Sequence, residues 1–241
     1  YEIIEQCTAY GYVLDSAPIA FKVDGEKTVV TVEKFNMPQK GIVNISKSGE
    51  VFFSAVESDG VYSFVFADKN LAGATYEITA AEDIITPDGT LRYAKGMVVD
   101  TVTTDESGNA ASKPLYLGKY TVRETKAPYG MVLNDEAKSV ELTYAGETVK
   151  LTETSAEFYN ERQKAEVSLS KILGKDKTFG IGNNGEILSV QFGLYAAEDL
   201  TAADGSVIPK DGLLEVANCN ENGSIAFKTD IPVGAKLYVK E

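Results

Sequence analysis

The sequence contains no histidine, no tryptophan and only two cysteines in 241 residues. Histidine is the commonest general base and a frequent zinc ligand, so its absence excludes Ser-His-Asp and Cys-His catalysis and most zinc sites. Two cysteines, Cys7 and Cys219, are too few for a disulfide scaffold or a cysteine-rich metal site. We expect both thiols to be free and partly buried, with a disulfide or a reactive thiol as the alternative. We expect no metal and no cofactor.

Basic residues are scarce relative to acidic ones. There are 23 Lys and Arg against 36 Asp and Glu, which gives a formal net charge of −13. This balance argues against a nucleic-acid partner, because binding to a phosphate backbone starts from a basic patch. No run approaches the roughly 18 consecutive apolar residues that span a membrane, so we expect no membrane contact by this segment. Hydrophobic residues still make up 44% of the chain, which is enough for a folded core.

Short segments that alternate apolar and polar residues predict an all-β protein made of antiparallel β-sandwiches. They are rich in β-branched and aromatic residues, and Asp-Gly and Asn-Gly turns separate them. The clearest are residues 41–46, 74–79, 120–124, 140–144 and 165–170. Residues 51–53 and 61–66 flank Asp59-Gly60 and predict an additional hairpin. No stretch shows a helical period of helix length.

An internal repeat organises the chain. Residues 42–47 resemble residues 166–171, and residues 76–83 resemble residues 192–199. A period of about 120 residues corresponds to a whole domain and is much longer than a solenoid repeat. We therefore predict three tandem parts: residues 1–38 as the C-terminal part of one repeat, 39–162 as a complete repeat, and 163–241 as the N-terminal part of a third. Where the complete repeat has its additional hairpin, the third has a short glycine-rich link, residues 180–185.

Three polar residues recur at matched places in the repeats. In the complete repeat they are Lys47 at the end of the first strand, Glu124 in a late strand and Asn160 in the last strand. Each lies two residues after an apolar one and so shares that residue's face of the strand. Three polar side chains in one apolar core are costly unless they contact one another. The partial repeats contain two equivalents each: Glu5 and Asn36, and Lys171 and Glu241.

The three residues together suggest a reaction. Burial disfavours charge, so we expect a lowered pKa and a neutral amine for Lys47. A protonated Glu124 could donate a hydrogen bond to the side-chain carbonyl of Asn160. Attack of the amine on that carbonyl carbon, proton transfer through Glu124 and loss of ammonia would leave an isopeptide bond. This is a single intramolecular turnover, so we do not expect an enzyme. The plainer interpretation is a surface lysine, an ion-paired glutamate and a turn asparagine.

The chain resembles the SpaA-like, collagen-adhesin B-type (CnaB, prealbumin-like) domains of Gram-positive surface proteins and pilins. The resemblance depends on residues 71–77, on residues 120–130, which match the family's E-box around Glu124, and on residues 158–161. It implies an inverse immunoglobulin-like sandwich and autocatalytic Lys–Asn cross-links. It also implies an extracellular location, with cell-wall anchoring through regions outside this chain. Neither partial repeat holds all three residues, so we expect no bond within either.

The favoured functional hypothesis is a structural stalk segment of a bacterial surface adhesin or pilin-like protein, with neighbouring domains of the same chain as its partners. The alternative is a ligand-binding adhesin module that recognises a glycan or a host matrix protein. An exposed aromatic patch rimmed by polar residues would favour the alternative. A third class, a true enzyme, needs a pocket with convergent ionisable groups, and the histidine-free sequence suggests none.

Overall fold

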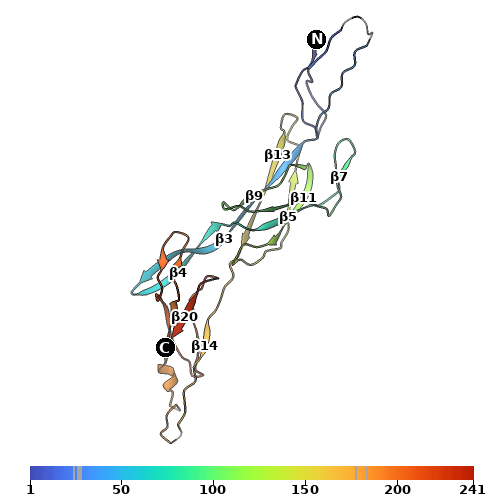
Figure 1. The fold of residues 1–241 in the computed structure, drawn as a ribbon. Helices are drawn as coiled ribbons and strands as arrows, with labels where there is room; N and C mark the ends of the chain where they lie inside the picture. Colours follow the sequence, from blue (N-terminus) through green and yellow to red (C-terminus); the bar gives the residue numbers. More distant parts are fainter. Residues whose placement is uncertain (24, 26–28, 177, 183) are drawn as a thin grey trace. The chain divides into compact units, whose positions relative to one another are not determined.

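The computed structural model describes residues 1–23, 25, 29–176, 178–182 and 184–241. Strands take up 48% of the residues and helix 2% (Figure 1), which confirms the all-β prediction. Within the described ranges, helix is confined to one 3-10 turn, η1 (Glu186–Ser189), which the sequence did not predict. No helix in this part of the chain is long and apolar enough to cross a membrane.

Twenty strands are present in the described residues. In chain order they are β1 (Glu2–Ile3), β2 (Ile19–Ala20), β3 (Lys40–Ser58), β4 (Val61–Asn70), β5 (Thr75–Ala80), β6 (Ile84–Ile85), β7 (Leu91–Tyr93), β8 (Val98–Thr103), β9 (Asn109–Ala111), β10 (Leu115–Tyr116), β11 (Gly118–Lys126), β12 (Lys138–Leu142), β13 (Leu151–Asn160), β14 (Ser168–Ser170), β15 (Gln191–Ala196), β16 (Leu200–Thr201), β17 (Val207–Ile208), β18 (Leu213–Asn218), β19 (Ser224–Ala226) and β20 (Leu237–Lys240).

The chain divides into two compact units. Unit 1 consists of residues 1–48, 70–128 and 133–159, and unit 2 consists of residues 49–69, 129–132 and 160–241. Compactness thus groups the chain differently from the repeat, because three segments of the complete repeat, residues 49–69, 129–132 and 160–162, fold within unit 2. The boundaries at residues 38 and 162 come from sequence similarity and remain a prediction.

Unit 1 is built from two layers of strands. The first half of β3 pairs with β9, β10 and β13, and the second layer has the strand order β12-β11-β5-β8. Figure 1 shows β5 and β11 side by side in the second layer. Alternate residues of β3 are buried from Gly41 to Gly49, as expected for a strand with one face on a core. The largest fully buried apolar side chains of this core are Ile45, Tyr76, Ile78, Ile84, Leu115, Tyr120 and Leu142.

Unit 2 has its own core and its own sheet. Strand β15 pairs with β18 on one side and with β20 on the other, and β18 also pairs with β4 in parallel. Two short antiparallel pairs, β14 with β19 and β16 with β17, complete the unit. Its buried core consists of Leu194, Ala196, Leu200, Ile208, Leu214, Cys219, Ile225, Phe227 and Ile231.

The predicted hairpin is present and is longer than expected. Strand β3 continues to Ser58 and β4 begins at Val61, so the turn lies at Asp59-Gly60 as predicted. Asp59 has φ 53° and Gly60 has φ 80°. A two-residue type I′ turn needs positive φ at both positions, which Asp-Gly adopts at low cost.

Both cysteines are free, as predicted, but they are not alike. Cys7 is exposed and Cys219 is buried. The expectation of two partly buried thiols was therefore wrong for Cys7, which lies outside any strand near the start of the chain. In the predicted glycine-rich link, Asn183 lies outside the described residues.

Candidate functional site

The site is centred on strands β3, β5 and β11 of unit 1. Lys47 belongs to the buried face of β3, two residues after Ile45, and Glu124 belongs to the buried face of β11, two residues after Val122. Antiparallel pairing places Glu124 opposite Tyr76 of β5, and the register shifts directly after Glu124. The period of two along each strand therefore directs these polar side chains into the apolar core, as expected.

Lys47 and Glu124 form a buried ion pair. The distance from Lys47 Nζ to Glu124 Oε1 is 3.2 Å, and both side chains are 0% exposed. The Tyr76 hydroxyl donates to the same Oε1 at 3.3 Å, and the backbone N–H of Asn134 donates to Oε2 at 3.1 Å. Both carboxylate oxygens therefore have partners, which holds the Glu124 side chain in one orientation.

Asn160 is the third member of the predicted set. It is the last residue of β13, which pairs with β3, the strand of Lys47. It is 1% exposed and lies two residues after buried Phe158. The division between the two compact units falls between Tyr159 and Asn160. All three predicted residues are thus buried polar groups; Lys47 and Glu124 belong to unit 1, and Asn160 belongs to unit 2.

The surroundings lower the pKa of the Lys47 amine. Burial lowers the pKa of Lys47, and this effect outweighs the opposing influence of the Glu124 carboxylate. Burial and the same carboxylate raise the pKa of the Tyr76 phenol, which keeps its proton as a donor. The ring centroids of Tyr76 and Phe158 lie 4.7 Å apart and add to the apolar surroundings. A desolvated lysine with a lowered pKa is a nucleophile.

Gly108 positions the backbone of Lys47 through a hydrogen bond. The Lys47 N–H donates to the Gly108 carbonyl at 2.8 Å, and the Leu71 N–H donates to the Lys47 carbonyl at 3.0 Å. Gly108 has φ +76°, and a Cβ there would lie 2.7 Å from the Lys47 carbonyl oxygen. Glycine is therefore required for this close approach.

The partial repeats bring their two members together at less buried places. Asn36 Nδ2 donates to both carboxylate oxygens of Glu5 at 2.9 Å. Lys171 Nζ lies 2.6 Å from Glu241 Oε2, with side chains 26% and 53% exposed. The Lys171–Glu241 pair lacks the enclosure of the Lys47–Glu124 pair, whose side chains are 0% exposed.

Sequence reasoning missed Tyr76 and Asn134 as partners of Glu124. The buried face of Tyr76 is readable from its alternation with Ile78, but its pairing with Glu124 depends on strand register. Asn134 contributes only a backbone N–H, which has no sequence signal. Among the described residues, no group of three or more Cys, Asp or Glu side chains is placed to hold a metal ion.

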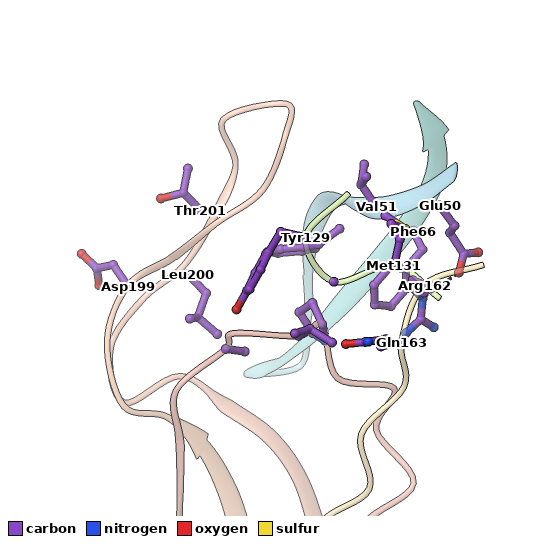
Figure 2. Close-up of a pocket in the computed structure, with 15 residues that line it drawn as sticks. Glu50, Val51, Phe66, Tyr129, Met131, Arg162, Gln163, Asp199, Leu200 and Thr201 are labelled. Carbon is purple, nitrogen blue, oxygen red and sulfur yellow. Dashed lines mark hydrogen bonds and ion pairs between the residues drawn. The ribbon is translucent and has the colours of Figure 1, made fainter. Parts of the chain in front are cut away.

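Unit 2 contains a separate surface cavity of about 320 Å³. Figure 2 shows Tyr129 in its middle, Arg162 and Gln163 on one side, and Asp199, Leu200 and Thr201 on the other. Tyr129 is 84% exposed. Arg162 is almost fully buried: its Nε donates to Glu50 Oε2 at 2.6 Å, its Nη2 pairs with Asp230, and its guanidinium stacks over Phe66.

Comparison with known proteins agrees with the fold. The family model described as "SpaA: Prealbumin-like fold domain" matches residues 67–157. The trypsin-resistant surface T6 protein of Streptococcus pyogenes serotype M6 is 28% identical over 146 residues, which cover 56% of this chain and 24% of that protein. The Bacillus anthracis TIE protein has 22% identity and a TM-score of 0.57, with 100% of this chain and 36% of that chain covered.

Solved pilins match with lower TM-scores. The major pilin SpaD from Corynebacterium diphtheriae has 22% sequence identity and a TM-score of 0.36, and the match covers 54% of this chain and 34% of that chain. This chain thus spans about a quarter of the T6 protein and about a third of the TIE protein. The matched segment includes β5, β8 and β11, and therefore Tyr76 and Glu124 of the buried site. Residues 67–157 thus match the prealbumin-like fold domain of the SpaA family, and the all-β fold agrees with this match.

Proposed function

We propose that this chain is a structural stalk segment of a Gram-positive cell-surface adhesin or pilin-like protein. In this proposal an isopeptide bond between Lys47 and Asn160, promoted by Glu124, stabilises the segment. The observation that supports it best is the fully buried Lys47–Glu124 pair in the core of unit 1. A buried ion pair often adds little net stability compared with apolar residues of similar volume. A chemical role explains why such residues occupy this place.

The proposed reaction balances without any co-reactant. The neutral Lys47 amine attacks the side-chain carbonyl carbon of Asn160 and gives up a proton through Glu124. Glu124 then delivers a proton to the departing amide nitrogen, which leaves as ammonia. One C–N bond forms and one C–N bond breaks. The fold supplies proximity, and the low dielectric strengthens each electrostatic interaction. The event occurs once per molecule, so the chain is a structural protein with no turnover.

The location of the bond fits a load-bearing role. Strand β3 begins at Lys40, and β13 ends at Asn160. A bond from Lys47 to Asn160 would carry tension past the segment between them, so that this segment would not unravel. The T6 protein is named as trypsin-resistant and as a surface protein. Protease resistance and an extracellular location are expected for this chain on the same grounds, with anchoring through other regions.

The repeat extends the proposal along the chain. We assign residues 39–162 as the complete repeat, with 1–38 and 163–241 as the corresponding C-terminal and N-terminal parts of its neighbours. Glu5 and Asn36 then correspond to Glu124 and Asn160. Lys171 and Glu241 correspond to Lys47 and Glu124 in the same way.

Single-molecule pulling from both termini tests the load-bearing role. With the bond in place, the segment between Lys47 and Asn160 cannot extend. In a Glu124→Ala variant the same segment of about 113 residues is released, which adds roughly 370–410 Å of contour length at full extension. An equal total extension for both proteins would contradict the proposal. Arg123→Ala, a change at an exposed neighbour on β11, is the matched control and should leave the extension unchanged.

The cavity of unit 2 favours a second candidate, a module that binds a glycan or a host matrix protein. An exposed Tyr129 beside polar Gln163, Asp199 and Thr201 provides the aromatic and hydrogen-bonding groups that such ligands use. A glycan array and a panel of matrix proteins test it. Binding that is lost in Tyr129→Ala would support this function, and absence of binding to every probe would refute it.

A further inference from the structure

The hairpin of residues 49–69 lies within the repeat of residues 39–162 in the sequence, but in the structure it packs with residues 160–241. Sequence similarity assigns it to the repeat of residues 39–162, whereas compactness assigns it to unit 2 together with residues 160–241. The third repeat has only the glycine-rich link 180–185 at the equivalent place. Among the described residues of this region, the equivalent place shows one isolated bridge, between Asp176 and Ile181.

Backbone groups tie the hairpin into unit 2. Val61 of β4 pairs in parallel with Leu213 of β18. The Phe52 carbonyl accepts the N–H of Ala203 at 3.1 Å, and the Phe53 carbonyl accepts the N–H of Asp204 at 3.0 Å. The hairpin thus contacts two separate places along the chain of unit 2, at β18 and at the turn after β16.

Aromatic side chains on one face of the hairpin join the unit 2 core. Phe52, Tyr62 and Phe64 pack against the cluster that contains Leu194, Ile208 and Leu214. The rings of Phe52 and Phe64 meet edge to face, with centroids 5.0 Å apart. The next residues along the strands, Phe53 and Val65, are 37% and 39% exposed. One face of the hairpin is therefore used for packing, and the other is open.

A close approach at Gly212 shows how tightly the hairpin is seated. A Cβ at Gly212 would lie 3.1 Å from Tyr62 Cδ2. At the other end of the hairpin, Glu50 pairs with buried Arg162, and the Arg162 guanidinium lies 3.8 Å from the centroid of Phe66. Figure 2 shows Glu50, Phe66 and Arg162 together at one side of the cavity.

We propose that residues 160–241 form an acceptor surface for a two-stranded β-hairpin with an aromatic face, and that residues 49–69 are its partner. Docking of this hairpin covers part of the apolar core of residues 160–241 and stabilises it. Without the hairpin, the apolar faces of β15 and β18 that pack on Phe52, Tyr62 and Phe64 would be open to water. Consecutive repeats of the chain are then interlocked and do not fold as independent modules. This inference does not depend on the isopeptide bond.

Excision of the hairpin tests the dependence. The Leu71 N–H donates to the Lys47 carbonyl at 3.0 Å, so the two strands are close enough at the base for Gly-Gly to replace residues 49–69. Hydrogen exchange is measured in β15 and β18 of unit 2, and in β5 and β11 of unit 1 as the internal reference. We expect β15 and β18 to lose protection while β5 and β11 keep it. Unchanged protection in β15 and β18 would overturn the proposal.

A synthetic peptide of residues 49–69 tests the acceptor surface directly. Added to the excised chain, it should bind and restore protection in β15 and β18. The same peptide with Phe52→Ser and Phe64→Ser should not bind. Failure of the unaltered peptide to bind, or equal binding of both peptides, would contradict the assigned partner.

If excision also disturbs unit 1, two point variants of the full chain test whether the aromatic face of the hairpin stabilises β15 and β18. Phe64→Ser removes an inward aromatic side chain, and Val65→Ser changes its outward neighbour on the same strand. We expect Phe64→Ser to speed exchange in β15 and β18 by at least about tenfold, because local opening requires less free energy. Val65→Ser should leave it unchanged. Equal effects of the two variants would refute the docking role.

Discussion

Replacing Asn160 or Glu124 by alanine separates two contributions to the stability of the protein. Asn160→Ala prevents the cross-link and leaves the Lys47–Glu124 pair in place. Glu124→Ala prevents the cross-link and also leaves the buried Lys47 amine without its carboxylate, which lies 3.2 Å away. Both variants therefore lose the cross-link, and only Glu124→Ala also loses the carboxylate partner of Lys47.

The expected magnitudes follow from the loop and from the burial. A bond between Lys47 and Asn160 closes a loop of about 113 residues, and the loop-entropy relation established for disulfides gives about 4–5 kcal/mol for this length. Removing one partner of a fully buried ion pair costs about 3–5 kcal/mol more. Asn160→Ala should thus lower the free energy of unfolding by about 4–5 kcal/mol, and Glu124→Ala by about 7–10 kcal/mol.

Urea denaturation at constant pH measures both values. Glu157→Ala, at an exposed position of β13, is the control and should stay within about 0.5 kcal/mol of the unaltered protein. The reasoning fails if Asn160→Ala is as stable as the unaltered protein. It also fails if Glu124→Ala is no less stable than Asn160→Ala.

Three further outcomes are expected. In Asn160→Ala, burial holds the pKa of the Lys47 amine below its ordinary value of 10.5. The unfolded chain then binds more protons than the folded one, so the free energy of unfolding of Asn160→Ala rises as the pH increases toward 10.5. Urea denaturation at several pH values measures this rise. The part of the rise that is due to Lys47 should be absent in the double variant Asn160→Ala/Lys47→Met. Gln39→Ala should cost about 2–4 kcal/mol in urea denaturation, because the buried amide donates to the carbonyls of Gly146 and Val149 at 2.9 and 2.6 Å; a cost under about 1 kcal/mol would contradict this. Gly108→Ala should lower thermal stability and slow cross-linking, because its Cβ would press on the Lys47 carbonyl. Mass spectrometry at intervals after refolding measures the cross-linking rate. An unchanged rate would count against this positioning role.

Much of the fold was predictable because the strands alternate regularly. Residues 41–46 lie within β3, residues 120–124 lie within β11, and residues 74–79 overlap β5 with a shift of one residue. Residues 165–170 were less well predicted, since only Ser168–Ser170 form β14. Such boundaries depend on pairing partners, which local pattern does not specify.

The burial of the site was predictable, and its surroundings were not. The two-residue spacing after Ile45, Val122 and Phe158 placed Lys47, Glu124 and Asn160 on buried faces. The role of Tyr76 depends on the register between β5 and β11, which is a long-range property.

The docking of the hairpin could not be predicted from the sequence either. Its strands and its Asp59-Gly60 turn have clear local signals. The surface on which its aromatic face packs is set by tertiary contacts with residues more than a hundred positions away.

Intact-mass spectrometry of the folded protein, with sequencing of its proteolytic peptides, tests the central claim most directly. The claim predicts a protein lighter than its sequence by one molecule of ammonia, and a branched peptide that joins Lys47 to Asn160. It also predicts the full sequence mass for Glu124→Ala. A full-mass unaltered protein, in which Lys47 and Asn160 appear only in separate linear peptides, would contradict it.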